Sequence, residues 1–444
     1  MKVFMLGWEF PPYISGGLGT ACYGLTRGLD EAGVEVLFVL PTALPHDASG
    51  HVQFRTPTNL SEGAPVSPGE AQRADEIVFK HVQMRMLPAV LQAYGTAESY
   101  REAVERLRKS GKLKKMDIPG FGVLESADLP SMEAQPGGYQ GDLMGQVRRY
   151  AALAVELAGR EDFDVIHAHD WMTYPAGLAV AAHTGKPLVV HVHSTEFDRS
   201  GENINQQVYD IERAGMHGAD RVACVSFLTR GTVLTRYGVP ADKIEVVYNA
   251  VEPPSGNGFD TTPITRDEKI VLFLGRITMQ KGPEYFLRAA KKVLEKCRKV
   301  RFIIAGSGDM VGQTVELAAS LGIGRYVTFA GFLRGDDVAK VFRMADLYVM
   351  PSVSEPFGIA PLEALSHNVP VIISKQSGVS EVLTHVLKVD FWDVEEMANK
   401  IVAVLRHPPL QATLRKESQR EVTRLNWQDS ARNCVRVYNQ VLSA

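Results

Sequence analysis

Residues 269–282 read KIVLFLGRITMQKG, and this segment says most about the architecture of the chain. After Lys269 its first residues are continuously apolar, with no alternation between apolar and polar side chains. Such runs are typical of strands buried on both faces, which occur in parallel sheets covered by helices. Gly275 ends the run and Gly282 ends the charged turn that follows it. The segment therefore predicts a strand and a turn into a helix, as in a parallel α/β sheet.

Short β-branched runs alternate with amphipathic stretches on both sides of this segment. The runs before it are Lys2–Gly7, Glu35–Leu40, Asp164–His169, Pro187–His193, Arg221–Val225 and Glu245–Tyr248. Those after it are Val300–Ala305, Tyr326–Ala330, Asp346–Met350 and Pro370–Ile373. Between the two sets, SGNGFDTTP at residues 255–263 has the composition of a linker. We predict an α/β protein in which two doubly wound, Rossmann-like parallel-sheet domains face each other across a cleft, the first over residues 1–254.

The composition excludes several classes of protein. The chain has 444 residues, enough for two or three domains, and its formal net charge of -3 argues against a nucleic-acid partner. Its four cysteines have no CxxC spacing, which favours reduced thiols over disulfides or a zinc site. No apolar run approaches 18 residues, and Glu9 and Pro11 interrupt the apolar start, unlike a signal peptide. We expect a soluble enzyme of the cytoplasm.

Residues 42–140 interrupt the alternation and form a long insert. Within it, residues 106–115 read RLRKSGKLKK and are strongly basic. A solvated helix face explains such a run, and this is the interpretation that we favour. The alternative is peripheral contact with an anionic membrane or polymer surface. We expect the insert to serve acceptor specificity and not to form a third domain.

Two groups of charged residues follow predicted strands in the second half of the chain. Parallel sheets bind their ligands at this position, just beyond the carboxyl ends of the strands. Arg276 and Lys281 can converge on one diphosphate, because arginine supplies forked donors and lysine a point charge. Their position favours this function over two solvated loop cations. Glu355 and Glu363 can accept hydrogen bonds from sugar hydroxyls, but from these residues alone two surface carboxylates are the favoured explanation. The N–H groups of residues 357–359 open a helix and can bind an anion or a hydroxyl.

A glycine-rich loop follows the first predicted strand. Residues 15–20 read SGGLGT, and a helical stretch comes next. Glycines let the backbone approach a phosphate, and the start of a helix offers free N–H groups. The loop lacks the G-x-G-x-x-G spacing of a dinucleotide site, and a purely steric turn also explains it.

Histidines end two predicted strands of the first half. In HAHDW, residues 167–171, His167 and His169 lie on one face of a strand, and HVHS adds His191 and His193. Ordinary helix-start geometry is the favoured explanation for His167. Zinc bound by all four is the competing one. For magnesium, the Asp-x-Asp at residues 162–164 lies at the wrong end of its strand, so we predict no metal site and no cofactor.

In this order, SGGLG, HAHDW, GR-x4-KG and E-x7-E resemble the motifs of the retaining GT-B glycosyltransferases of family 4, which are related to the glycogen and starch synthases. The resemblance covers nearly the whole chain and is strongest over residues 269–382. The ending NWQDSARNCVRVYNQVL resembles the last helix of that family, which crosses back to the N-terminal domain. The resemblance implies a GT-B fold with a nucleotide-sugar-binding domain over residues 255–424 and a returning helix over residues 425–444.

The resemblance also implies roles for the residues that would hold the donor nucleotide. Arg276 and Lys281 would bind the diphosphate, and Glu363 the ribose. Gly16 and Gly17 would approach the phosphates from the other domain.

Further roles concern the transferred sugar and the base. Glu355 would grip the hydroxyls of the sugar, and His169 would contact the sugar near the reacting centre. Gly331 would flank the base. The backbone groups that help to hold the sugar would be those of Phe357, Gly358 and Ile359.

The implied activity is transfer of a hexose, with glucose favoured, from a nucleoside-diphosphate sugar to a glucan or another saccharide. The configuration would be retained through front-face attack, without a metal ion. The donor base stays open, because Ile14 occupies the lysine position of the K-x-G-G-L loop of ADP-glucose-using glycogen synthases. The alternatives are a lipid or small-molecule acceptor, or a protein that binds a nucleotide sugar without catalysis.

Overall fold

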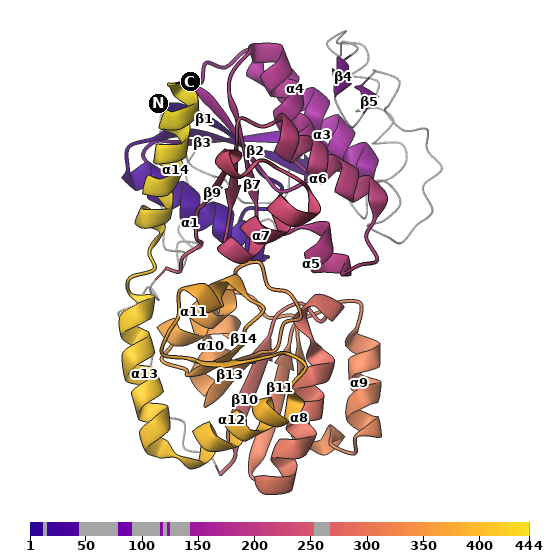
Figure 1. Ribbon diagram of the computed structural model, residues 1–444, viewed down its shortest axis with the longest axis vertical. Helices are drawn as coiled ribbons and strands as arrows, with labels where there is room; N and C mark the ends of the chain where they lie inside the picture. The colour runs from indigo at the N-terminus through magenta and orange to yellow at the C-terminus, as the bar shows by residue number, and fades with distance from the viewer. Residues whose placement is uncertain are drawn as a thin grey trace, which may run out of the picture.

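The computed structural model describes residues 1–11, 16–43, 79–90, 116–118, 122–124, 143–252 and 267–443. It contains two helix-covered sheets, the N-terminal one at the top of Figure 1 and the C-terminal one below it. The predicted linker at residues 255–263 and the basic segment at residues 106–115 lie outside the described residues. The predictions made for these two segments therefore stay predictions.

The N-terminal sheet has seven parallel strands in the order β3-β2-β1-β6-β7-β8-β9. The strands are β1 (Lys2–Leu6), β2 (Glu35–Ala43), β3 (Val82–Val90), β6 (Val165–His169), β7 (Leu188–Val192), β8 (Arg221–Cys224) and β9 (Ile244–Val246). The edge strand β3 comes from the predicted insert, where we expected no strand of the sheet. A separate antiparallel pair, β4 (Met116–Ile118) and β5 (Gly122–Leu124), also lies within it.

The C-terminal sheet has six parallel strands in the order β12-β11-β10-β13-β14-β15. They are β10 (Lys269–Leu274), β11 (Val300–Ala305), β12 (Val327–Gly331), β13 (Leu347–Met350), β14 (Val371–Ser374) and β15 (Leu387–Val389). In both sheets the chain runs outward from a central strand, returns, and continues on the other side. The prediction of two doubly wound, parallel-sheet domains is confirmed.

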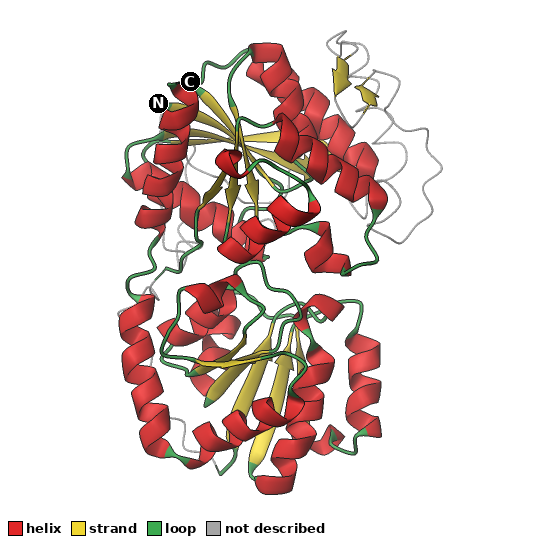
Figure 2. Ribbon diagram, viewed as in Figure 1, coloured by secondary structure: helices red, strands yellow, loops and turns green. Residues whose placement is uncertain are grey.

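Helices cover both faces of each sheet (Figure 2). In the first domain they are α1 (Gly17–Glu31), α3 (Leu143–Ala158), α4 (Tyr174–Thr184), α5 (Glu196–Ser200), α6 (Gln206–Gly218) and α7 (Phe227–Arg236). In the second they are α8 (Pro283–Lys296), α9 (Val311–Ser320), α10 (Asp336–Met344), α11 (Ile359–Ser366), α12 (Val394–Arg406) and α13 (Pro408–Val422). Each sheet therefore has an apolar core on both of its faces. In the C-terminal sheet, Val271 and Phe273 of β10 belong to the core on one face, and Ile270 and Leu272 belong to the core on the other. The N-terminal sheet likewise has two cores.

The last helix, α14 (Trp427–Leu442), leaves the C-terminal domain and packs against α1 of the other domain (Figure 1). Two glycines of α1 make room for it. A Cβ atom at Gly24 would lie 2.0 Å from the Trp427 ring, and one at Gly28 would lie 2.4 Å from the Trp427 carbonyl oxygen. The close fit ties the end of the chain to its beginning. Among the described helices, none combines the length and the apolar character needed to cross a membrane.

Candidate active site

The two central strands of the C-terminal sheet, β10 and β13, place charged residues side by side at their carboxyl ends. Arg276 follows β10, Lys281 lies in the short 3-10 helix η4 (Met279–Lys281), and Glu355 follows β13. The Lys281 Nζ atom lies 2.5 Å from Glu355 Oε2, and the Ser352 hydroxyl donates to the same oxygen at 3.1 Å. Glu355 is 6% exposed, so the ion pair is held in a largely dry site. Two residues that the sequence assigned to different parts of the donor thus contact each other.

Two glycines permit this convergence. Gly282 has a φ of 63°, and a Cβ atom there would lie 2.4 Å from the carbonyl oxygen of Pro351, in the loop that carries Glu355. Gly306 has a φ of 145°, and its Cβ atom would lie 1.8 Å from the carbonyl oxygen of Gly275. Residues with side chains would separate the loops after β10, β11 and β13. The glycine after Lys281 is therefore a structural requirement of the site.

Arg276 lies where the two domains face each other. Its Nη2 atom donates to Gln280 Oε1 at 3.3 Å. Burial raises the pKa of Glu9, a residue of the other domain, whereas the N–H of Gly19 and the positive charge of Arg276 act in the opposite direction. The sequence argument used Glu9 only to exclude a signal peptide. An acidic residue directly after a buried strand was the signal for its position at the cleft.

The glycine loop of the first domain is described from Gly16 onward. The carboxylate of Glu9 occupies the space beside Gly16, where a Cβ atom would lie 2.7 Å from Glu9 Oε2. A Cβ atom at Gly17, the first residue of α1, would meet no described atom within 4 Å. Packing within the described protein therefore does not demand glycine at position 17. The open space leaves room for the phosphate approach predicted for Gly17, which stays a prediction.

Glu363 lies on α11 and lines a cavity of about 280 Å³ between the domains. Burial raises its pKa to about 7. Burial raises the pKa of Tyr348 on β13, and the charges of Glu355 and Glu363 raise it further, so both carboxylates lie near this strand. The other residues around the cavity come from α1, α10, α11, α14 and the segment after β9, and are Thr20, Tyr23, Val251, Glu252, Gly335, Val338, Ala339, Phe342, Ile359, Ser366, His367 and Trp427.

The segment predicted to hold the sugar opens α11. Phe357 is buried, so it offers only its backbone, and Gly358 has a φ of 103° at the N-terminal cap of the helix. The loop is pinned to the segment after β14, because the Gly378 N–H donates to the Glu355 carbonyl oxygen at 2.9 Å. Gly331 ends β12 with a φ of 70°, and its carbonyl accepts from the Gly306 N–H at 2.7 Å. The Gly378 contact thus fixes the loop between Glu355 and α11, and the Gly331 contact joins the ends of β11 and β12.

The four histidines of the first domain form one layered group at the ends of β6 and β7. His169 has no exposed surface, and its Nδ1 atom lies 2.9 Å from Nε2 of His193. His193 is 9% exposed, the most of the four. A side chain without exposed surface is poorly placed to touch a sugar. The contact of His169 with the sugar stays a prediction, and His193, the most exposed of the four, is a second candidate for it.

Asp170 positions the segment that carries His193. It has a φ of 60°, unusual for a residue with a side chain, and its Oδ1 atom accepts from the N–H groups of His193 at 2.7 Å and Ser194 at 3.3 Å. Burial raises the pKa of Asp170 to about 7, whereas the nearby Arg199 charge lowers it. The strained backbone and the buried carboxylate indicate a loop held in one conformation.

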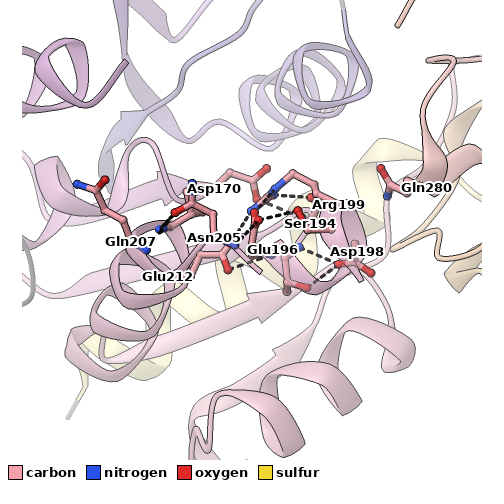
Figure 3. Close-up of polar contacts among 12 residues, drawn as sticks. Asp170, Ser194, Glu196, Asp198, Arg199, Asn205, Gln207, Glu212 and Gln280 are labelled. Carbon is pink, nitrogen blue, oxygen red and sulfur yellow. Dashed lines mark hydrogen bonds and ion pairs between the residues drawn. The ribbon is translucent and has the colours of Figure 1, made fainter. Parts of the chain in front are cut away.

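A polar network extends from this loop to the other domain (Figure 3). Arg199 pairs with Glu196 at 3.1 Å, and it also pairs with Glu212. Asp198 accepts from the backbone and hydroxyl of Thr195, and its other oxygen accepts from the Ser354 hydroxyl at 2.5 Å. Ser354 precedes Glu355, so α5 is linked directly to the loop of the ion pair.

The comparisons with known proteins place the whole chain among glycosyltransferases. Three family models match successive parts of it: the starch synthase catalytic domain over residues 2–107, glycosyltransferase family 4 over residues 133–253 and glycosyl transferases group 1 over residues 258–421. The chain is 29% identical over 398 residues to an uncharacterised glycosyltransferase of Methanocaldococcus jannaschii, covering 87% of this chain and 83% of that one. It is 24% identical over 447 residues to the glycogen synthase of Mycobacterium tuberculosis, covering 99% of this chain and 94% of that one.

Solved structures agree on the fold. Sucrose-phosphate synthase from Thermosynechococcus elongatus superposes with a TM-score of 0.72 at 19% identity, over 100% of this chain and 99% of that one. The Anabaena protein HepE in complex with UDP and glucose gives a TM-score of 0.63 at 18% identity, over 99% and 100%. Together with the motif order and the paired doubly wound domains, these matches support a glycosyltransferase with the GT-B fold that is similar to the glycogen and starch synthases.

Proposed function

We propose that this glycosyltransferase moves a hexose, with glucose favoured, from a nucleoside-diphosphate sugar to a glucan or another saccharide, in the cytoplasm. The transfer retains the anomeric configuration and needs neither a metal ion nor a cofactor. The observation that carries the proposal is the Lys281–Glu355 ion pair, whose charged atoms are 2.5 Å apart. The pair and Arg276 follow the carboxyl ends of β10 and β13, the two central strands of the C-terminal sheet. In doubly wound sheets this is the position at which ligands bind.

The cations account for departure of the leaving group. Cleavage of the bond to the sugar builds negative charge on the diphosphate. Arg276 and Lys281 supply fixed positive charge there, and α11 begins in the same region with free N–H groups. These groups can stabilise the departing diphosphate in the way that a bound magnesium ion does in other enzymes. A diphosphate would compete with Glu355 for Lys281 and leave that carboxylate free to accept from sugar hydroxyls.

The carboxylate geometry supports retention by front-face attack. Oε2 of Glu355 is engaged by Lys281 and by Ser352, which suits a residue that holds the sugar and not a covalent nucleophile. The nucleoside diphosphate would take the proton of the acceptor hydroxyl as that oxygen bonds to the anomeric carbon. His193, at the edge of the histidine group, and its neighbour His169 would line the sugar site from the opposite domain.

Relatives support the substrate classes. The glycogen synthase matched over 99% of this chain supports a glucan acceptor, and the structure of HepE with UDP and glucose supports a uridine nucleotide as one donor to test. The D-inositol 3-phosphate glycosyltransferase of Salinispora arenicola, 27% identical over 402 residues, supports a small-molecule acceptor as the alternative.

A substrate matrix tests the proposal. UDP-, ADP- and GDP-hexoses are each incubated with glucan, small-sugar and lipid acceptors, with and without EDTA, and the released diphosphate is measured. We expect EDTA-resistant release that depends on a saccharide acceptor, and an NMR coupling constant that shows the donor's own anomeric configuration in the product. Inverted product, or activity abolished by EDTA, would contradict the mechanism.

Two outcomes of the same matrix would point to the alternatives. If diphosphate is released only with lipid or inositol-type acceptors, the acceptor is a lipid or a small molecule and not a saccharide. If the donor binds but no diphosphate is released under any condition, the protein is a non-catalytic nucleotide-sugar binder. Loss of that binding in the Lys281→Ala variant would show that the donor occupies the site that contains Lys281.

A further inference from the structure

The histidine group of the first domain has an arrangement that the transfer reaction does not require. His167 and His169 lie on β6, and His191 and His193 follow them on the neighbouring strand β7 and just after it. Ring centroids are 4.2 Å apart for His167 and His169, 4.4 Å for His191 and His193, and 5.3 Å for His169 and His191. Only one of the four needs to line a sugar site. The others form a layer beneath it.

Most of the ring nitrogens in this layer have no hydrogen-bond partner among the described residues. Both nitrogens of His191 are unpartnered, as are Nε2 of His169 and Nδ1 of His193. His191 is 1% exposed, so water does not reach its ring freely. A buried polar atom without a partner is costly, so Nε2 of His169 and Nδ1 of His193 are candidates for contact with a ligand that the described residues do not supply.

We propose that Cys22, His169 and His193 form a binding site for a transition-metal dication of the zinc type. Cys22 lies on α1 and is fully buried. One ligand atom from each of the three residues lies within 4.8 Å of the others. Thiolate sulfur and imidazole nitrogen select zinc over magnesium, which prefers oxygen ligands. On binding, Cys22 releases its thiol proton to solvent and coordinates as the thiolate.

A second set, His167, His169 and His191, has the same spacing but is less suitable. Nδ1 of His167 is already engaged by the Tyr438 hydroxyl of α14 at 2.6 Å, and all three residues are fully buried. The first set includes His193, whose partial exposure provides a route for the ion from the cleft. Three protein ligands leave a fourth position open, as in zinc sites that are accessible to small molecules.

The expected consequence is inhibition by zinc, and this clause alone rests on the proposed function. An ion held by His193 withdraws that imidazole from the sugar site and presents a charge to it. The absence of a metal requirement for transfer is compatible with this site, since the ion is not part of the reaction.

Direct metal binding tests the site without any activity measurement. Chelator-treated full-length protein is titrated with Zn²⁺ by calorimetry and with Co²⁺ by absorption, because a thiolate ligand gives cobalt a charge-transfer band in the near ultraviolet. We expect one ion per chain and the thiolate band. Cys22→Ala should abolish the band and weaken Zn²⁺ binding by more than the roughly 10- to 100-fold that is typical of losing an outer partner. Cys22→Ser keeps the volume of the side chain and guards against a folding defect.

Cys434→Ala is the matched control, because Cys434 is also buried but lies on α14, outside the set. It should bind both ions as the parent does. The site is wrong if the parent retains no ion and shows no thiolate band, or if Cys434→Ala loses the ion as fully as Cys22→Ala. Binding that both alanine variants retain unchanged would also overturn the assignment, because it would lie elsewhere on the surface.

Discussion

The two sheets have the same winding order. The carboxyl ends of their strands form two edges that face each other, and the residues at these two edges have opposite chemistry. After β10 and β13, the C-terminal sheet presents Lys281 and Glu355 as an ion pair, with Arg276 beside them. At the carboxyl ends of β6 and β7, the N-terminal sheet presents a layer of histidines, and burial lowers the pKa of His191 to about 3. One edge is charged and suits a diphosphate. The other is neutral and suits a sugar ring or a soft metal ion. A shared scaffold thus leaves the chemistry to the few residues that follow each strand.

The largest expected effect comes from breaking the charged edge. Lys281→Ala removes the cation that faces the leaving diphosphate, and we expect a loss of about 2–4 kcal/mol in transition-state stabilisation, measured as kcat/KM. Lys292→Ala is a matched control, since Lys292 is an exposed lysine of α8 paired with Glu395. Equal turnover in both variants would contradict the role of Lys281.

The histidine edge is tested through the residue that holds it. Asp170→Ala leaves the N–H groups of His193 and Ser194 without their acceptor and removes an anion from near Arg199. We expect the free energy of unfolding in urea to fall by about 1–3 kcal/mol. Asp390→Ala, which removes an exposed carboxylate paired with Lys375, should change it little. A neutral Asp170→Ala would mean that the loop is held by its other contacts.

The cavity carboxylate predicts a pH dependence. Glu363 has a pKa raised from 4.5 to about 7 in the folded chain, so between these values the folded state keeps a proton that the unfolded state has lost. The stability of the unliganded protein should therefore fall as pH rises from about 4.5 to 7 and level off above, with this group accounting for about 1–2 kcal/mol after allowance for its partial exposure. Glu363→Gln should lose that slope in urea titrations at several pH values. A variant whose slope matches the parent would contradict the raised pKa.

The link between the two edges has the smallest expected effect. Ser354→Ala removes the hydroxyl that donates to Asp198 across the domains, and we expect a loss of about 0.5–1.5 kcal/mol in kcat/KM, because one hydrogen bond that joins the two sides of the site is lost. Ser320→Ala deletes an exposed hydroxyl that bonds only within its own helix, and it should have no effect. Equal kcat/KM values for the two variants would mean that activity does not depend on the Ser354–Asp198 contact.

Strands with a continuous apolar run could be predicted from the sequence, whereas the edge strand β3 could not. β10 and β11 match their predicted bounds, because residues buried on both faces leave an unmistakable run. β3, Val82–Val90, carries polar Gln83 and Arg85 at the sheet edge, and it lies beyond a long stretch without regular pattern. An edge strand needs only one partner, so its own sequence shows little of its place.

The positions in the fold of the C-terminal candidate residues could be inferred more directly from the sequence than those of the first domain, and their roles stay predictions. Arg276, Lys281 and Glu355 stand directly after strands, so their sequence positions imply their place in space. His193 and Glu9 could not be assigned a role in this way, because the exposure of a histidine and the partner of a carboxylate depend on what packs over them. Cys22 comes from a helix far from the histidines in sequence, and no spacing motif connects them.

The sequence by itself determined the fold class, the order of the strands along the chain and the identity of the charged residues, because these follow from local periodicity and from residues adjacent to strand ends. Only the tertiary structure decided which groups meet: Lys281 with Glu355, Ser354 with Asp198, and Cys22 with His169 and His193. The reason is that parallel winding brings together loops that are tens to hundreds of residues apart. Their final separation depends on side-chain packing and on glycines such as Gly282 and Gly306 that permit close approach.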